Sequence, residues 1–153
     1  MSIFNGLNIT ASALTAGRLR MDVISSNMAN VDTTRGKLVD GEWQPYKRKM
    51  VVTQPNQPGF SSFLNSAMKT TSQNGTVGNG VKVTGIVEDQ TPNKLVYNPD
   101  HPDANEDGYV EMPNVDPLKE MVDLMSATRS YEANVTVFNA NKSMLMKALE
   151  IGK

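Results

Sequence analysis

The sequence predicts an α+β fold in which two long terminal helices form a coiled-coil-like pair and a small β-containing insert lies between them. Apolar residues recur every seven positions near both ends of the 153-residue chain. The middle of the chain instead holds clusters of glycine, proline and asparagine separated by short runs rich in β-branched residues. We therefore expect an N-terminal helix over 1–32, an insert over 33–114 and a C-terminal helix over 115–153.

Two series of residues with a spacing of seven define the N-terminal helix. They are Leu7, Leu14, Met21 and Met28, with Ile3, Thr10, Gly17, Ile24 and Val31 at companion positions. This spacing places both series on one stripe, which is typical of a helix that packs against another helix. Thr10 and Gly17 weaken the stripe, so this helix should be marginally stable alone. We expect it to end near Asn30, before a segment of β-branched and turn residues.

The C-terminal helix has a clear start signal and a similar repeat. Asp116 is a favourable N-cap and Pro117 a favourable first helical residue. Acidic residues in the first turns, Glu120 and Asp123, complement the positive end of the helix dipole. The two series of the stripe are Leu124, Tyr131, Phe138 and Leu145, with Met121, Thr128, Val135, Lys142 and Leu149. We expect this helix to end near Ile151.

The insert contains four runs that favour β-structure. They cover Tyr46–Thr53, 81–87, Lys94–Tyr97 and Gly108–Met112. Residues near 55–80 are rich in serine, threonine, asparagine and glycine, which predicts a flexible loop.

Composition excludes several classes of site and partner. The net charge is −1 with no basic block, which argues against nucleic acid or anionic lipid as the main partner. The absence of cysteine excludes disulfides and thiolate metal sites. No stretch approaches about 18 apolar residues, so we expect no membrane span. The N-terminal residues lack the basic and apolar regions of a secretory signal, and by these rules alone the chain would be cytoplasmic.

One stretch of the insert has the spacing of calcium ligands. Asp103, Asn105, Asp107 and Gly108 occupy alternate ligand positions and the turn position of a calcium loop. Asn114, however, stands where a bidentate glutamate belongs, and no helix pattern precedes the stretch. The preferred interpretation is a polar turn that leads into a strand.

No other group of residues predicts catalysis or a cofactor. His101 is the single histidine, and it lies between prolines without a nucleophile motif, which favours a surface turn. The basic run Lys47–Lys49 is interpreted as a solvated strand edge, or as a contact for an acidic partner. We therefore predict no catalytic residue, no metal and no cofactor, and we do not expect an enzyme.

Three motifs, in the same order along the chain, resemble those of bacterial flagellar rod and hook proteins. Ser26–Thr34 resembles the SNxANxxT signature that closes their N-terminal helix; its matching residues are Asn27, Ala29, Asn30 and Thr33. Arg129–Asn134 resembles their C-terminal RxYEAN signature through Tyr131, Glu132 and Asn134. Gly108–Pro117 is similar to a stretch of proximal rod proteins; we single out Pro113, Asn114, Asp116 and Pro117.

The resemblance implies a structural subunit of the flagellar basal body. It implies export through the flagellar type III apparatus without a cleaved signal, and assembly into the periplasmic rod that transmits torque. This would replace the cytoplasmic interpretation. The implied partners are other rod proteins and basal-body components near the inner-membrane ring.

The resemblance also implies that the terminal helices pack against neighbouring subunits, through self-association or hetero-assembly, and are disordered before assembly. The assembly interface expected here comprises Leu7, Leu14, Met21, Ile24, Met28, Leu124, Tyr131, Val135, Phe138, Leu145 and Leu149. We expect Asn27 and Asn30 to cap the N-terminal helix, and Tyr131 and Phe138 to anchor the helix seam.

Two alternatives stay open from the sequence. The chain could be another rod subunit of the same family. It could also be a cytoplasmic flagellar export adaptor built as a helical hairpin, which should fold stably on its own.

Overall fold

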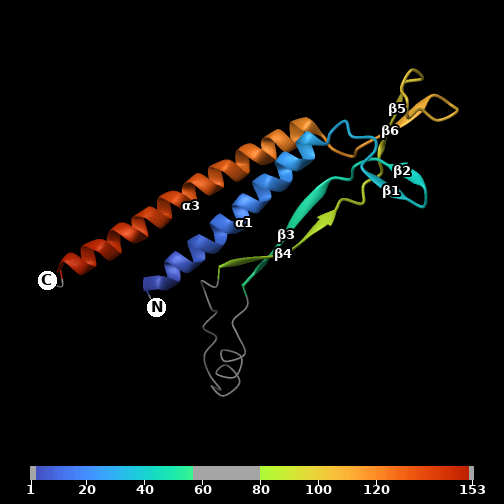
Figure 1. The fold of residues 1–153 in the computed structure, drawn as a ribbon. Coiled ribbons are helices and arrows are strands. Elements are labelled where there is room, and N and C mark those ends of the chain that lie inside the picture. Colours follow the sequence, from blue (N-terminus) through green and yellow to red (C-terminus); the bar gives the residue numbers. More distant parts are fainter. Residues whose placement is uncertain (1–2, 57–79, 152–153) are drawn as a thin grey trace, which may run out of the picture. The chain divides into compact units, whose positions relative to one another are not determined.

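The computed structural model describes residues 3–56 and 80–151, so most of the predicted loop near 55–80 lies outside the described residues. One long helix precedes six short strands and another long helix follows them along the described chain (Figure 1), which confirms the predicted α+β class. The helices are α1 (Ile3–Ala29) and α3 (Pro117–Ile151). The strands are β1 (Lys37–Val39), β2 (Glu42–Gln44), β3 (Lys49–Pro55), β4 (Val81–Glu88), β5 (Lys94–Tyr97) and β6 (Tyr109–Met112). Within the described ranges, neither helix carries a stretch apolar enough to cross a membrane.

The chain forms two compact units, and each unit contains parts of both helices. The terminal unit comprises Met1–Arg18, Thr53–Thr84 and Arg129–Lys153. The insert unit comprises Leu19–Val52 and Gly85–Thr128. This grouping by contact differs from the division along the chain at 32 and 115 that the sequence predicts.

Local hydrogen bonds explain why the helices begin and end where they do. The backbone N–H of Leu118 donates to the Asp116 carboxylate at 3.1 Å, and Pro117 is the first helical residue of α3, as predicted. At the end of α1, Asn30 donates through its side-chain amide to the Ser26 carbonyl at 2.8 Å. The Thr33 hydroxyl donates in turn to the Asn30 side-chain oxygen at 3.2 Å, which leads the chain from the helix into the insert.

In the terminal unit, α1 and α3 run antiparallel. A Cβ atom added to Gly6 would lie 3.4 Å from the Asn141 side chain, and one added to Gly17 would lie 3.6 Å from the Tyr131 ring. Gly17, which weakens the apolar stripe in the sequence, therefore lies directly beside the Tyr131 ring. Gly80 has φ +73°, and a Cβ there would lie 2.5 Å from the Ser12 hydroxyl, so the start of β4 requires glycine.

The strands of the described ranges form three two-stranded sheets, β1–β2, β3–β4 and β5–β6. The pair β5–β6 is antiparallel with Tyr97 opposite Tyr109, and these two rings make an edge-to-face contact at 5.3 Å. The predicted runs at Lys94–Tyr97 and Gly108–Met112 agree with β5 and β6 to within one residue.

The antiparallel hairpin β1–β2 was not predicted from the sequence. Its two-residue turn is Asp40-Gly41, and both residues have positive φ, at 52° and 91°. Aspartate-glycine is a strong signal for a turn of this type. The adjoining strands are only three residues long, which is why no alternating pattern marks them.

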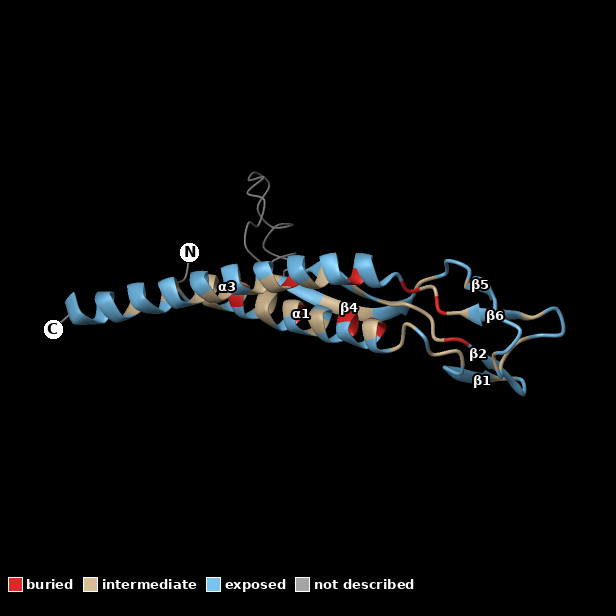
Figure 2. Cartoon of the chain, turned by 90° about the horizontal axis from the view of Figure 1, so that it is seen from above, coloured by how far each residue is buried: buried red, intermediate tan, exposed pale blue. Residues whose placement is uncertain are grey.

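Burial is sparse and is concentrated in the insert unit (Figure 2). Among the described residues, the buried apolar side chains are Ala16, Val23, Ile24, Val110, Val115 and Ala127. Of the residues that the structure describes in the terminal unit, only Thr10 and Ala16 are buried. The 35-residue helix α3 buries just Glu120 and Ala127. Most of its length therefore lacks an apolar core of its own within the described chain.

The residues predicted for the helix seam differ in their burial. Ile24 is buried. Nine other side chains of the predicted seam are half-buried, namely Leu7, Leu14, Met21, Met28, Leu124, Tyr131, Val135, Phe138 and Leu145. Met121 and Leu149, which share the predicted stripe, are exposed. Leu149 is 75% exposed because α3 continues past Asn141, the residue that faces Gly6 near the start of α1.

Asp116→Ala should lower the free energy of unfolding by about 1 kcal/mol, because it removes the acceptor for the Leu118 N–H. Urea denaturation followed by the fluorescence of Trp43, the single tryptophan, measures this. Asp116→Ser keeps an N-cap oxygen and should unfold nearly as the unmodified chain does. Equal destabilisation by serine and alanine would contradict the capping role.

Candidate assembly site: a buried polar network and an exposed helix face

Asn27 is the centre of a buried polar network in the insert unit and is 1% exposed. Its side-chain amide donates to the Lys49 carbonyl at 2.9 Å and to Glu120 at 3.1 Å. Its side-chain oxygen accepts from the Lys49 N–H and from the Tyr46 hydroxyl, both at 2.9 Å. Asn27 thus pairs with the backbone of Lys49 as a neighbouring strand would. The prediction that it caps α1 is wrong, because its side chain points to β3 and α3.

Glu120 has no exposed surface and shares its two carboxylate oxygens between two partners. One oxygen accepts from Arg48 Nε at 2.5 Å, and the other accepts from Asn27. Arg48 also reaches Asp123 at 3.3 Å and Asp89 at 3.6 Å. A buried carboxylate is costly unless it is paired and hydrogen-bonded, and here both conditions hold.

Asn114 extends the network to two further backbone segments. Its side-chain oxygen accepts from the Arg48 N–H at 2.7 Å. Its amide group donates to the carbonyls of Asp89 and Thr91, at 3.3 Å and 3.0 Å. Asn114 therefore holds the start of β3, the segment after β4 and the segment before α3 together.

The electrostatics of the network favour the charged forms of Arg48 and Asp89. Burial is the largest single influence on Arg48 and lowers its pKa. The hydrogen bond and charge of Glu120, with contributions from Asp89 and Asp123, outweigh it and raise the pKa. The pKa of Asp89 is lowered, first by hydrogen bonds from the Thr91 side chain and backbone and then by Arg48. The solvated-edge interpretation of Lys47–Lys49 is therefore wrong for Arg48, whose side chain is 12% exposed.

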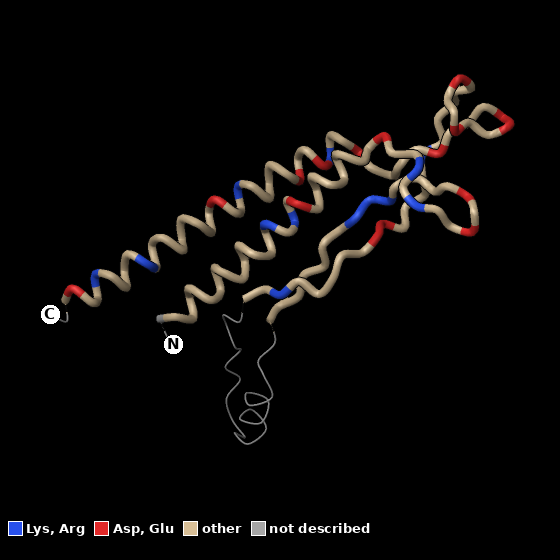
Figure 3. The backbone as a smooth tube through the Cα atoms, viewed as in Figure 1, with Lys and Arg blue, Asp and Glu red and all other residues tan. Residues whose placement is uncertain are grey.

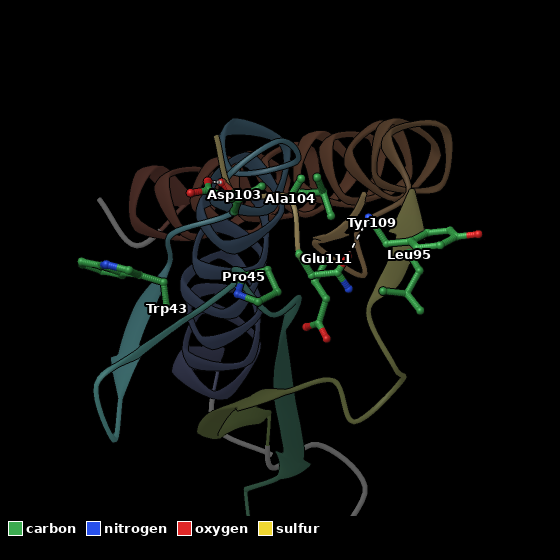
Figure 4. A pocket seen from close by; sticks show the side chains of 10 residues that line it. Trp43, Pro45, Leu95, Asp103, Ala104, Tyr109 and Glu111 are labelled. Carbon is green, nitrogen blue, oxygen red and sulfur yellow. Dashed lines mark hydrogen bonds between the residues drawn. The ribbon is translucent and has the colours of Figure 1, made fainter. Parts of the chain in front are cut away.

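A second connection joins the segment after α1 to the loop between β5 and β6. The Asp103 carboxylate accepts from the Thr34 hydroxyl at 2.7 Å and pairs with the Arg35 guanidinium at 2.5 Å. These two residues, in that order, lower the pKa of Asp103. Asp103 also borders a hollow of about 330 Å³ that has Trp43 on one side and Leu95 and Tyr109 on the other (Figure 4).

The stretch with calcium-ligand spacing forms a polar turn in the structure. Asn105 accepts from the N–H groups of Asp107 and Tyr109, at 3.1 Å and 2.8 Å, and Gly108 has φ +80°. His101 lies in the same loop, and its Nδ1 accepts from the Asp103 N–H at 3.1 Å. Within the described ranges, no three histidine or acidic side chains converge as a metal site would require.

Helix α3 presents an apolar face to solvent in the insert unit. Its exposed residues are Leu118, Met121, Val122 and Met125, at the spacing of one helix face. Leu118 and Met125 are 74% and 64% exposed. Glu120 and Ala127 lie on a different side of the helix and are buried. The helix therefore has one apolar face without a covering partner among the described residues.

The remaining motif residues have smaller roles in the structure. Glu132 pairs with Arg129 at 3.2 Å on the exposed surface, and Asn134 donates to the Ser130 carbonyl at 2.9 Å. Ala29 is exposed at the end of α1, and Pro113 is buried beside Asn114.

Sequence reasoning missed the partnership of Asn27 and Glu120, although one signal was available. Glu120 precedes Leu124 by four residues and Ala127 by seven, so an acidic residue stands on the seam face of α3. A charge at such a position requires a buried partner. The sequence does not say that this partner is Arg48.

Glu120→Leu should lower the free energy of unfolding by about 3–5 kcal/mol, because Arg48 would stay buried without its main partner. Adding Arg48→Met should recover part of this loss, because the double variant leaves neither charge unpaired. Urea denaturation of the two single variants and the double variant, followed by Trp43 fluorescence, measures the coupling. Additive losses would contradict the network.

Asp103→Asn should make the stability of the fold depend less on pH in the acidic range. The folded-state pKa of Asp103 is lowered, so its ionised form stabilises the fold above about pH 4, the unfolded value, and this contribution disappears as the pH falls through the folded pKa. The stability difference between the unmodified chain and Asp103→Asn should therefore shrink below about pH 4. Urea midpoints at several pH values test this, and a constant difference would contradict it.

The terminal segments match two family models. Residues 7–36 match the model described as "Flagella basal body rod protein", which covers most of α1 and the segment after it. Residues 106–151 match the model described as "Flagellar basal body rod FlgEFG protein C-terminal", which covers β6, Asn114 and α3.

Curated relatives resemble the chain along its whole length. The "Flagellar basal-body rod protein FlgC" of Bacillus subtilis is 65% identical over 153 residues, which is 100% of both chains. Proteins with the same name in Escherichia coli O6:H1 and Borreliella burgdorferi are 46% and 45% identical, and at least 98% of each chain is covered. The chain therefore belongs to the family of flagellar basal-body rod proteins and is a structural subunit of that rod.

Proposed function

We propose that the chain is a subunit of the proximal rod, the part of the flagellar axle nearest the inner-membrane ring, and that it helps to transmit torque. The names of its relatives and the motif at Gly108–Pro117 support this position over another rod position. The same relationship supports export by the flagellar type III apparatus without a cleaved signal, and assembly in the periplasm with other rod proteins.

The observation that carries the proposal is the poor burial of α3. A 35-residue helix with two buried residues cannot be held by its own core. Fully burying a side chain such as Leu118 or Met125 is worth about 1.5–3 kcal/mol, so a neighbouring subunit that covers this face would gain much from it. Assembly through the terminal helices, whether with copies of the chain or with other rod proteins, supplies such a cover.

The two units suggest a division of labour during assembly. The insert unit contains the network around Asn27, Arg48 and Glu120 and nearly all the residues that are buried in the described part of the chain. The terminal unit buries only Thr10 and Ala16 among its described residues. We expect the insert unit to fold first and the terminal unit to become ordered on neighbouring subunits. This asymmetry favours a rod subunit over an export adaptor, which would need a stable hairpin.

A structural role, as opposed to a catalytic one, also agrees with the chemistry of the side chains. The carboxylates of Asp103 and Glu120 each form an ion pair with an arginine, Arg35 and Arg48 respectively. Their interactions hold segments together and leave neither carboxylate free to act as a base.

Met125→Glu and Phe138→Asp should each block rod assembly, because each places a charge where we expect neighbouring helices to pack. Swimming in soft agar and electron cryotomography of basal bodies measure the effect. The matched control is Ser130→Glu, an exposed position that does not stand three, four or seven residues from any member of the apolar face, and this variant should swim normally. Normal motility of both test variants would contradict the proposed interface.

Deletion of the gene tests the position in the rod. The expected result is basal bodies with rings and export apparatus but without a rod. Complete rods in the deletion strain would overturn the proposed function.

A further inference from the structure

Three lysines line one hollow of the insert unit. The hollow has a volume of about 200 Å³ and is bordered by Lys37 of β1, Lys47, and Lys49 of β3. Glu88 is the only carboxylate among the described residues that line it. The hollow thus has an excess of positive charge and would attract an anionic group.

The lysines of this hollow have no anionic partner in the described part of the chain. Lys49 Nζ lies 5.4 Å from the centre of the Tyr46 ring, which is a cation–π contact. Neither Lys37 nor Lys47 makes an ion pair with a described residue, whereas the side chain of Arg48, between Lys47 and Lys49, enters the buried network. The lysine hollow is therefore available to a ligand or a neighbouring protein.

The same unit also carries an excess of negative charge at a different place. The acidic loop, residues 98–108 between β5 and β6, contains the exposed carboxylates Asp100, Glu106 and Asp107 and no lysine or arginine. None of the three forms an ion pair within the described ranges. Figure 3 shows acidic residues at the outer turns of the insert and basic residues along the start of β3.

Local hydrogen bonds hold the acidic loop in one conformation. The Gly108 N–H donates to the Asn105 carbonyl at 2.9 Å, and the Asn105 side chain accepts from Asp107 and Tyr109. Asp103 fixes the other side of the loop through Thr34 and Arg35. A preorganised loop loses little conformational entropy on binding, so Glu106 and Asp107 are suited to insertion into a basic hollow.

We propose that the acidic loop of one subunit docks into the lysine hollow of a second copy of this chain in the rod. This inference rests on the proposed function, because it needs copies of the chain to be neighbours. A second copy is the favoured occupant because the chain carries both halves of the contact and does not pair them within itself. Contact between two different patches is head-to-tail, and repetition of such a contact builds a ring if the rotation closes and an open helical array if it does not.

A cysteine pair tests the contact directly. The chain has no native cysteine, so Lys47→Cys together with Glu106→Cys introduces only the intended thiols. Mild oxidation of isolated basal bodies should give disulfide-linked dimers and longer oligomers of the chain on non-reducing gels. The control pair, Lys82→Cys with Glu106→Cys, uses an exposed lysine outside the hollow and should stay monomeric.

The cross-linking result also separates this inference from the proposed function. Rods that contain the double-cysteine chain but give only monomers would overturn the docking contact and leave the rod assignment intact. Complete rods in the deletion strain would overturn both. A disulfide formed within single chains would likewise overturn the contact between copies.

Charge reversal identifies the partner. Lys37→Glu with Lys47→Glu, and separately Glu106→Lys with Asp107→Lys, should each lower incorporation into rods about tenfold, because like charges would face each other. All four changes in one chain should restore incorporation to within about twofold, because every copy then supplies both reversed surfaces. If the variant with all four substitutions assembles no better than the two variants with two substitutions each, the occupant of the hollow is not a second copy.

Discussion

The pairing of Glu120 with Arg48 and Asn27 is the interaction on which the insert unit depends. Glu120 is fully enclosed, so its charge is tolerable only while Arg48 and Asn27 both bond to it. Each partner is in turn fixed elsewhere, Asn27 by the backbone of Lys49 and Arg48 by Asp89 and Asp123. The end of α1, the start of β3, the end of β4 and the first turn of α3 therefore meet in one arrangement.

A polar centre of this kind specifies register in a way that an apolar centre would not. Asn27 bonds to both the N–H and the carbonyl of one residue, Lys49, so a shift of β3 by a single residue would break both bonds and reverse the faces of the strand. Small apolar side chains such as Val23 and Ala127 would tolerate such a shift more readily. We therefore regard the network as a device for specificity as much as for stability, a role that buried polar groups have in some other folds.

The sequence predicted the features that depend on neighbouring residues and missed those that depend on distant ones. The two helices and the cap at Asp116 follow from heptad spacing and local hydrogen bonding, and strands β5 and β6 follow from short β-branched runs. The partners of Asn27 are 19 to 93 residues away, so nothing local distinguishes its role from that of a helix cap. Arg48 was misassigned for the same reason, because a basic run looks solvated until Glu120 is placed against it.

The network also fixes the start of α3, a helix that is poorly buried over most of its length. Exposed apolar residues along α3, such as Leu118 and Met125, would favour unspecific association if the helix direction were undefined. The first turn of α3 is instead fixed against α1 through Glu120 before any neighbour is needed. Under the proposed function, the direction of the first turn of α3 and the side of it that faces α1 are therefore fixed before the subunit joins the rod. Neighbouring subunits then have to supply only apolar cover along the rest of the helix, and this is the part of the fold that the isolated chain leaves incomplete.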